Sequence, residues 1–215
     1  MKGEVVYGRR PVAEARRGRR RVHEVWEAPK VDAAELERLA GSPDHQGIVA
    51  RVDPYPYADP NSLLEAPDAL VVACDQIQDP HNLGAICRSA EAAGVSGVVI
   101  CERRAVGVTP AVCKASAGAV EHLPVARVRN LADWLLAARE AGAWSYGAAV
   151  EADRGYADVD LSGRAVIAIG GEGGGLRPRV RDSCDELISI PTAGVVGSLN
   201  ASVAAAVLMF SAARV

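Results

Sequence analysis

The sequence predicts an α/β protein in which a parallel sheet is flanked by helices and preceded by a small separate α/β unit. Two observations support this prediction. After residue 68, short runs that are apolar throughout alternate with helical patterns, which is typical of parallel strands buried on both faces. Before that point, a proline-rich polar stretch at residues 53–68 separates a shorter α/β pattern from the rest of the chain.

Composition sets the broad class of protein. A chain of 215 residues with 49% hydrophobic content has enough apolar side chains for a sizeable core. It contains no apolar run as long as a membrane span, and its first residues lack the apolar core of a secretory signal, so we expect a cytoplasmic protein. Five scattered cysteines and four isolated histidines show no metal-ligand spacing, which predicts free thiols and no metal site.

Residues 1–53 are expected to form the small unit. The stretch "VHEVWEA" at 22–28 is typical of a strand, "VDAAELERLAG" at 31–41 of a helix ending at Gly41, and "QGIVARV" at 46–52 of a second strand. Residues 54–68 are expected to be an extended linker, and residues 69–215 the larger domain.

The larger domain contains six expected strands and four expected helices. The strands are expected at 69–74, 97–101, 123–128, 144–150, 165–171 and 186–191, and the helices at 80–93, 109–117, 130–141 and from Ser198 onward. In the last helix, Leu199, Val203, Ala206 and Phe210 recur at helical spacing and predict one apolar face. The pattern alone does not say whether that face packs in the core or against a partner.

Charge is concentrated near the N-terminus. The net charge is only −3, so the molecule as a whole is not a basic surface for nucleic acid. Seven arginines nevertheless lie close together, with Glu14 as the single acidic residue among them: Arg9, Arg10, Arg16, Arg17, Arg19, Arg20 and Arg21. Such a patch is able to contact phosphates, and the alternative is an ordinary solvated face.

The stretch "DPHNLGAICRSAEAAG" at 79–94 contains the first polar cluster. Asp79 and Pro80 suit the start of a helix. Asn82 and Arg88 lie about 240° apart on an ideal helix, so both reach one ligand only if Asn82 occupies an irregular entry to the helix. In the alternative interpretation, Arg88 pairs with Glu91 and Asn82 assists the cap.

Two further polar clusters follow strands. In "IAIGGEGGGLRP" at 167–178, five glycines surround Glu172 directly after an apolar strand, so the backbone is able to approach a ligand at the carboxyl end of a parallel sheet. A merely flexible loop is the alternative. In "ISIPTAGVVGSLNASVAAAVLMF" at 188–210, Ser198 suits a helix cap. Asn200 beside it is harder to explain structurally.

Together these stretches resemble the signature motifs of the SpoU (TrmH-like) branch of the SPOUT RNA ribose 2′-O-methyltransferases. The matching patterns are "DxIxDPxNxGxIxRxAxAxG" at 75–94, "GGEGxGL" at 170–176 and "IPxxGxxxSLNxSVAAAVxxF" at 190–210. The stretches "YGRRPVAEA" and "HQGIVARV" further resemble the RlmB-type subgroup, which has a small RNA-binding domain ahead of the catalytic one. Here that domain is shortened, because only "PK" separates "VHEVWEA" from "VDAAELERLAG".

The resemblance implies a C-terminal deep trefoil knot, a homodimer and S-adenosyl-L-methionine as cofactor. The implied catalytic residues are Arg88, Asn82, Glu172, Ser198 and Asn200. The implied cofactor-binding residues are Gly170, Gly171, Glu172, Gly173, Gly174, Leu176, Ile190, Pro191, Ser198 and Leu199. Physically, a guanidinium is a weak base, so we expect Arg88 to bind a phosphate and stabilise the nascent alkoxide of the ribose.

The expected reaction is methylation of a ribose 2′-hydroxyl, with a guanosine in 23S ribosomal RNA as the favoured target. Transfer RNA and an antibiotic-resistance site on ribosomal RNA are the alternative substrates. Two other classes of function stay open. A non-catalytic nucleotide- or RNA-binding module has no need of Arg88, Glu172 and Asn200 together, and a methyltransferase for small molecules or proteins has no need of the arginine patch.

Overall fold

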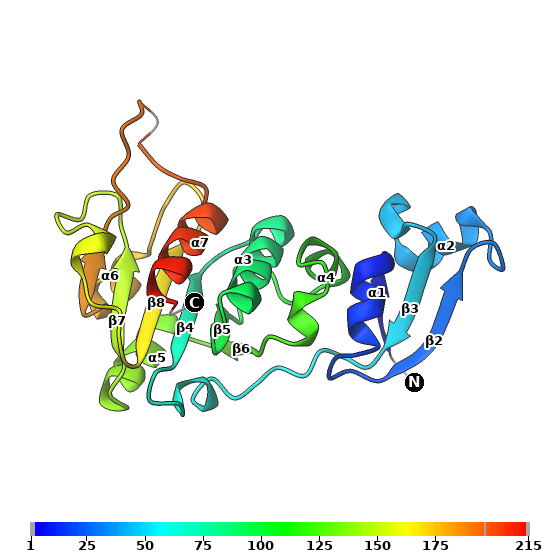
Figure 1. Cartoon of the computed structure of the whole chain (residues 1–215), viewed down its shortest axis with the longest axis horizontal. Coiled ribbons are helices and arrows are strands. Elements are labelled where there is room, and N and C mark those ends of the chain that lie inside the picture. Colours follow the sequence, from blue (N-terminus) through cyan, green and yellow to red (C-terminus); the bar gives the residue numbers. More distant parts are fainter. Residues whose placement is uncertain (1–2, 196, 214–215) are drawn as a thin grey trace.

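The computed structural model of the protein describes residues 3–195 and 197–213. It has an elongated shape, with a small sheet at one end and a larger sheet covered by helices at the other (Figure 1). The three-stranded small sheet has the order β1-β3-β2, and the six-stranded large sheet has the order β6-β5-β4-β8-β7-β9. The predicted α/β architecture is therefore confirmed.

The small sheet is antiparallel. Its strands are β1 (Glu4–Tyr7), β2 (Val22–Glu27) and β3 (Ile48–Val52), and the helices beside them are α1 (Arg9–Ala15) and α2 (Ala33–Ala40), followed by the 3₁₀ turn η1 (Pro43–His45). The Asp32 side chain caps α2, and Gly41 ends it with a φ of 64°, as the sequence predicts. The sequence prediction missed β1 and α1, because the density of arginine there hid the short apolar pattern of Val6, Val12 and Ala15.

All strands of the large sheet are parallel. They are β4 (Leu70–Asp75), β5 (Gly97–Cys101), β6 (Val125–Val128), β7 (Trp144–Ala148), β8 (Ala165–Gly170) and β9 (Glu186–Ile188). The α-helices are α3 (Pro80–Ala92), α4 (Pro110–Ala115), α5 (Leu131–Glu140), α6 (Pro178–Ser183) and α7 (Ala201–Ala212). The 3₁₀ turns are η2 (Ser62–Leu64), η3 (Ala119–Glu121) and η4 (Tyr156–Asp158). Of these α-helices, the short α6, which follows the glycine loop, was not expected.

Helices cover both faces of the large sheet because alternate strand residues are apolar on each side. Val72 and Cys74 of β4 share a buried cluster with residues of α3, α4 and α7. Val71 and Ala73 share the opposite cluster with residues of α5 and α6. The strands of the large sheet are therefore buried on both faces.

Strand register brings the motif segments to one edge. Asp75 at the end of β4 pairs with Gly170 at the end of β8. On the other side of β8, β7 pairs with β8 and with β9, where Ala148 lies opposite Ile188. The loops that follow these four strands therefore emerge side by side at the carboxyl edge of the sheet, where open α/β sheets bind ligands.

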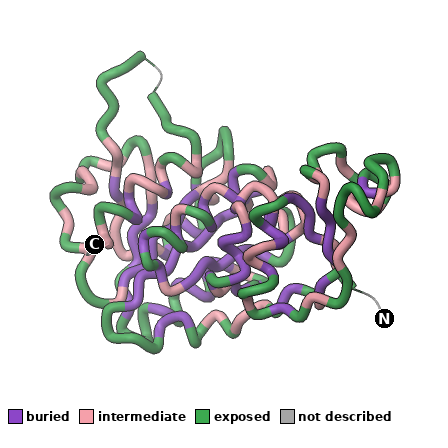
Figure 2. Tube along the Cα trace, turned by 45° about the vertical axis from the view of Figure 1, so that its right-hand side comes forward, coloured by how far each residue is buried: buried purple, intermediate pink, exposed green. Residues whose placement is uncertain are grey.

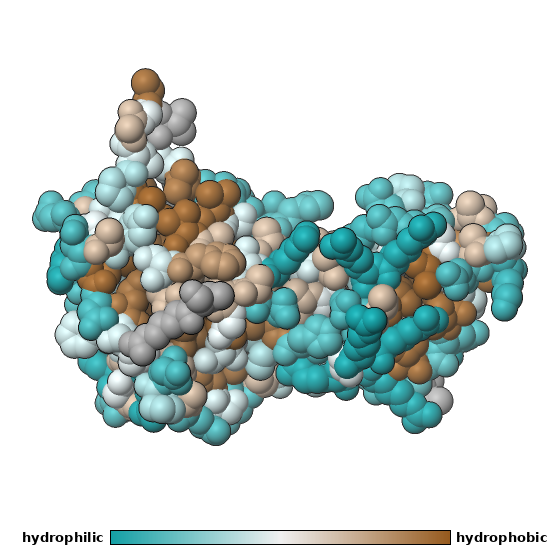
Figure 3. All heavy atoms as spheres, viewed as in Figure 1, coloured by the Kyte–Doolittle hydropathy of each residue, from teal (hydrophilic) through white to brown (hydrophobic). Residues whose placement is uncertain are grey.

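Helix α7 has two apolar faces. Ala205, Leu208 and Met209 are buried in the core. Val203 and Phe210, which belong to the predicted apolar face, are 48% and 50% exposed. Figure 3 shows hydrophobic side chains gathered over α7 on the surface of the molecule. The predicted face is therefore not part of this chain's own core.

The predicted extended linker at residues 54–68 is packed against the large domain at several points. Tyr55 is buried, and its hydroxyl donates to the carbonyl oxygens of Val120 and Leu123, each at 3.0 Å. Tyr57 accepts a hydrogen bond from the Val108 N–H at 2.9 Å. The Ala58 N–H donates to Val125 O, which joins the linker to the edge strand β6.

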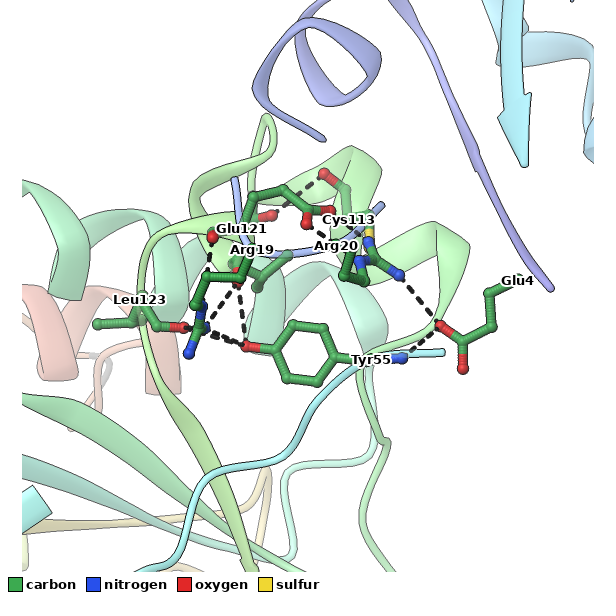
Figure 4. Close-up of polar contacts among 9 residues, drawn as sticks. Glu4, Arg19, Arg20, Tyr55, Cys113, Glu121 and Leu123 are labelled. Carbon is green, nitrogen blue, oxygen red and sulfur yellow. Dashed lines mark hydrogen bonds and ion pairs between the residues drawn. The ribbon is translucent and has the colours of Figure 1, made fainter. Parts of the chain in front are cut away.

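Two of the seven arginines hold the small domain against the large one (Figure 4). The Arg20 guanidinium is buried and forms an ion pair with Glu121, whose side chain is equally buried. A second ion pair joins Arg20 to Glu4 at 3.1 Å. The Arg19 guanidinium donates to Leu123 O at 2.7 Å. The expectation that Arg20 contacts RNA is therefore wrong, because its charge is already neutralised inside the protein.

Candidate functional site

The glycine loop after β8 is the centre of the candidate site. A Cβ atom on Gly170 would lie 2.0 Å from the carbonyl carbon of Gly175, and one on Gly171 would lie 2.8 Å from Gln76 O. Gly173 and Gly175 have φ values of 78° and 61°, which L side chains rarely adopt. The loop closes on itself through a hydrogen bond from the Gly175 N–H to Gly171 O at 3.1 Å. Four of its five glycines are therefore required by the local structure.

The fifth glycine faces open space. A Cβ atom on Gly174 would meet no atom within 4 Å. Gly174 lines a cavity of about 550 Å³, which lies within the size range of small-molecule sites. A glycine there is not required by packing, and it leaves room for another molecule to approach the backbone.

The cavity brings together most of the predicted cofactor-binding residues. Gly170, Gly171, Glu172, Gly173, Gly174, Leu176, Ile190, Ser198 and Leu199 all line it. Pro191 is exposed and is not among the lining residues. Residues 191–195 and 197–200, between β9 and α7, are exposed and project from the body of the molecule (Figure 2).

Three predicted catalytic residues form one hydrogen-bond chain. The Asn82 side chain is buried in the first turn of α3, and its amide nitrogen donates to the Glu172 carboxylate. The Asn200 amide nitrogen in turn donates to Asn82 Oδ1 at 3.0 Å. The chain links α3, the glycine loop and the start of α7, which are far apart in the sequence. Asn82 lies within a regular helix, so the expected irregular entry is not needed for this contact.

Asn200 also has a structural role that the sequence interpretation assigned to Ser198. Its Oδ1 accepts hydrogen bonds from the Ser202 and Val203 N–H groups at 2.8 and 3.4 Å, so Asn200 is the N-cap of α7. The helix begins at Ala201 rather than at Ser198. Ser198 is exposed and lines the cavity without a hydrogen bond to the other catalytic candidates.

Arg88 stands apart from this cluster. It is exposed on α3, and within the described residues no hydrogen bond or ion pair involves its guanidinium. The alternative in which Arg88 pairs with Glu91 is therefore wrong. Arg88 also does not line the cavity of its own chain. Its side chain is free to meet a substrate or a second molecule.

Sequence reasoning missed two ion pairs that support the site. The Asp75 side chain is completely buried and accepts hydrogen bonds from the Arg177 backbone N–H and Nε, each at 2.8 Å. This pair anchors the end of the glycine loop to β4. On the opposite wall of the cavity, Glu151 pairs with Arg181. The pKa of Glu151 is lowered, first by its own backbone N–H and then by Arg181. Asp75 and Arg177 both lie within the motif stretches, but they are 102 residues apart and no local pattern shows that they pair. Glu151 and Arg181 lie outside those stretches.

The described residues support the expected free thiols. All five cysteines are free, and four are buried. Burial raises the pKa of Cys87 to about 12. Over the part of the chain that the structure describes, there is no group of three or more side chains suited to a metal ion. The same residues include no helix of the length and apolarity needed to cross a bilayer.

Fold and site together define a ligand-binding α/β domain joined to a small domain with many arginines. Residues 69–210 match the SpoU rRNA Methylase family, and residues 27–58 match a domain described as RNA 2′-O ribose methyltransferase substrate binding. The chain belongs to the SpoU rRNA methylase family, as its motifs predict.

Relatives of known sequence and structure agree with this assignment. The chain is 38% identical to a putative TrmH family tRNA/rRNA methyltransferase, YacO, of Bacillus subtilis, over 98% of this chain and 95% of the relative. It is 46% identical to an uncharacterized tRNA/rRNA methyltransferase of Mycobacterium avium, over 86% of this chain and 61% of the relative. The crystal structure of the SpoU methyltransferase AviRb from Streptomyces viridochromogenes in complex with AdoMet superposes with a TM-score of 0.81 at 31% identity. It covers 98% of this chain and 89% of AviRb.

Proposed function

We propose that the protein transfers a methyl group from S-adenosyl-L-methionine to a ribose 2′-hydroxyl of RNA, with a guanosine of 23S ribosomal RNA as the favoured target. The observation that carries this proposal is the Asn82–Glu172–Asn200 chain beside the glycine-lined cavity. It joins the three motif segments of the family at one site. Membership in the family and the RNA substrate-binding match support RNA as the substrate class.

The cavity suits the proposed cofactor. Apolar walls from Ile169, Ile188 and Leu176 suit an adenine ring, and the exposed backbone at Gly174 offers polar groups without a side chain in the way. AviRb, which shares 31% identity with this chain, was crystallised with AdoMet. When bound, the cofactor supplies an electrophilic methyl group on sulfur.

The chain's own residues orient the reactants in this proposal. Asn82 donates to Glu172 and accepts from Asn200, so both amide groups have one defined orientation. That constraint holds the glycine loop and the start of α7 around the cavity, and leaves the exposed Glu172 carboxylate able to accept a further hydrogen bond from a ribose hydroxyl or an arginine. Arg88 is proposed to bind the neighbouring phosphate and stabilise the alkoxide as the proton leaves.

We also propose that the protein is a homodimer built on α3 and α7. The apolar residues Leu199, Val203 and Phe210 are all exposed. A helix at the surface of a monomer seldom exposes several large apolar side chains together. Arg88 projects from α3, which packs against α7, and does not reach its own cavity. In a dimer formed by these helices, Arg88 is proposed to serve the partner's cavity. The C-terminal trefoil knot stays a further expectation from the family.

The five remaining arginines are proposed to attract RNA. Arg9, Arg10, Arg16, Arg17 and Arg21 are all exposed, unlike Arg20. Their charges lie on the small domain and provide contacts to phosphates that add affinity without selecting a sequence.

Labelled cofactor tests the proposal directly. The protein is incubated with S-adenosyl-L-methionine labelled on its methyl group and with separated ribosomal and transfer RNA. We expect the label in ribosomal RNA, at a linkage that resists alkaline hydrolysis because the 2′-oxygen is blocked. Label in transfer RNA alone would show that transfer RNA, and not ribosomal RNA, is the substrate. Label on a base, on protein or on no RNA at all would overturn the proposed reaction.

A further inference from the structure

A basic groove crosses the junction between the two domains. It is lined by Arg9, Arg10 and Pro11 of α1, Gln46 of the small domain, and Lys114 and Ala117 of the large domain. No aspartate or glutamate is among these lining residues. Figure 3 shows hydrophilic side chains gathered over α1 and the adjoining junction. The groove is more open than the cavity at the glycine loop, so it suits a chain that passes through it rather than an enclosed small molecule.

Lys114 reaches from the large domain into the small one. Its ammonium group donates to Asp44 O at 2.8 Å and lies 5.8 Å from the centre of the Tyr7 ring. A Cβ atom on Gly8 would lie 2.7 Å from Lys114 Nζ, so the ammonium group lies close to the Gly8 backbone. Gly8 has a φ of 96°, which L side chains rarely adopt, so glycine is favoured there by the backbone conformation.

The cations of the groove lack carboxylate partners. None of the ion pairs among the described residues involves Arg9, Arg10 or Lys114. Arg9 Nε has only a long contact of 3.4 Å to Gln46 O. Burial lowers the pKa of Lys114, and Asp44 only partly offsets that effect. Three uncompensated cations around one groove create a site that favours an anion.

Buried polar contacts join the two domains beside the groove. The buried ion pair of Arg20 with Glu121 lies at the same junction, and the Tyr55 hydroxyl is bonded to the large domain beside it. A groove formed by side chains of two domains binds a ligand more weakly if the domains must first be ordered, because that ordering costs free energy. The Arg20–Glu121 ion pair and the Tyr55 hydrogen bond reduce this cost.

We propose that this interdomain groove binds the phosphodiester backbone of the RNA substrate, with Lys114 of the large domain as a phosphate ligand beside Arg9 and Arg10. Guanidinium groups match phosphate oxygens with paired hydrogen bonds, and an ammonium group adds a point charge. The groove then determines how far from the cavity an RNA strand is held. This proposal rests on the proposed function, because it takes RNA as the substrate.

Two triple variants of the full-length protein test the groove. Arg9→Gln/Arg10→Gln/Lys114→Gln removes its three cations. Lys30→Gln/Arg38→Gln/Arg51→Gln removes the same charge from exposed positions of the small domain outside the groove. Binding of a fluorescein-labelled 20-nucleotide polyuridylate is measured by anisotropy between about 50 and 200 mM salt. Thermal melting confirms that both variants are folded.

We expect the groove variant to lower the log–log salt slope by about 2, since each phosphate contact to a single strand contributes about 0.7. The control variant should lower it by less than half as much. Equal slopes for the two variants, or an unchanged slope in the groove variant, would overturn the proposal. If the groove variant is unstable, Arg9→Gln/Arg10→Gln is compared with Arg38→Gln/Arg51→Gln, with an expected difference in slope of about 1.

Methyl transfer to ribosomal RNA separates this inference from the proposed function. If the wild-type protein methylates ribosomal RNA while both triple variants behave alike, the groove proposal fails and the enzyme assignment stands. If the wild-type protein transfers no methyl group to RNA, the proposed function itself fails. With both proposals correct, the groove variant raises the apparent KM for RNA far more than it lowers kcat, which is the pattern of lost binding remote from the reacting atoms.

Discussion

The buried ion pair between Arg20 and Glu121 should be the most sensitive point of the contact between the two domains. Burial by itself lowers the pKa of Arg20, but the hydrogen bond to Glu121 and the nearby negative charges raise it overall, so the guanidinium stays charged. The substitution Glu121→Gln preserves shape and removes the countercharge. Arg20 then remains buried with one other carboxylate, Glu4, which is 40% exposed.

Breaking a buried ion pair by removing one partner typically costs about 3–5 kcal/mol. We expect a value near the lower end, about 3 kcal/mol, because Glu4 still compensates part of the charge at 3.1 Å. For a chain of this size that loss corresponds to a fall in Tm of about 6–12 °C. Calorimetry measures the fall in Tm, and limited proteolysis of residues 53–68 shows whether the domains separate first.

Two matched variants make the test specific. Glu35→Gln removes the carboxylate of a surface pair with Arg38 and should leave Tm almost unchanged. Arg20→Met combined with Glu121→Leu replaces both buried charges by apolar groups and should recover most of the loss. A Glu121→Gln protein that melts within about 2 °C of the wild type would refute the reasoning, since the pair would then contribute little to the contact.

Three further predictions concern Arg88, the glycine loop and the Cys184 thiol. Arg88→Ala should lower methyl transfer on the order of 10²–10³-fold with cofactor affinity nearly unchanged, measured by turnover and calorimetry; retention of more than about a third of the turnover would exclude a role at the reacting oxygen. Gly174→Val should weaken cofactor binding in calorimetry without changing Tm, because its Cβ meets no protein atom. Gly171→Val should lower both the cofactor affinity and Tm, because its side chain would displace Gln76 O. Full cofactor affinity in Gly174→Val would show that this residue is not part of the site. Burial raises the pKa of Cys184 to about 12, so its thiol should stay protonated at pH 8 and react with a disulfide reagent far more slowly than free cysteine; a rate like that of free cysteine would show that the thiol is open to solvent.

The sequence by itself determined the alternation of strands and helices in the large domain. Runs such as "GVVIC" are apolar throughout, so burial on both faces and a parallel sheet followed from local composition. The motif segments were also visible in sequence, because glycines and polar side chains interrupt apolar patterns where strands end. Family membership rested on those motifs and was confirmed by the match to residues 69–210.

Only the tertiary structure decided which arginines are available to a substrate. Arg20 and Arg21 are neighbours in one basic run, yet Arg20 is buried against Glu121 and Arg21 is exposed. The partner of Arg20 lies 101 residues away, and no local pattern reveals a contact at that separation. The same holds for the Asn82–Glu172–Asn200 chain and for Lys114 in the interdomain groove. Sequence patterns report the periodicity of nearby side chains, whereas these contacts exist because strand order and domain docking bring distant segments to one place.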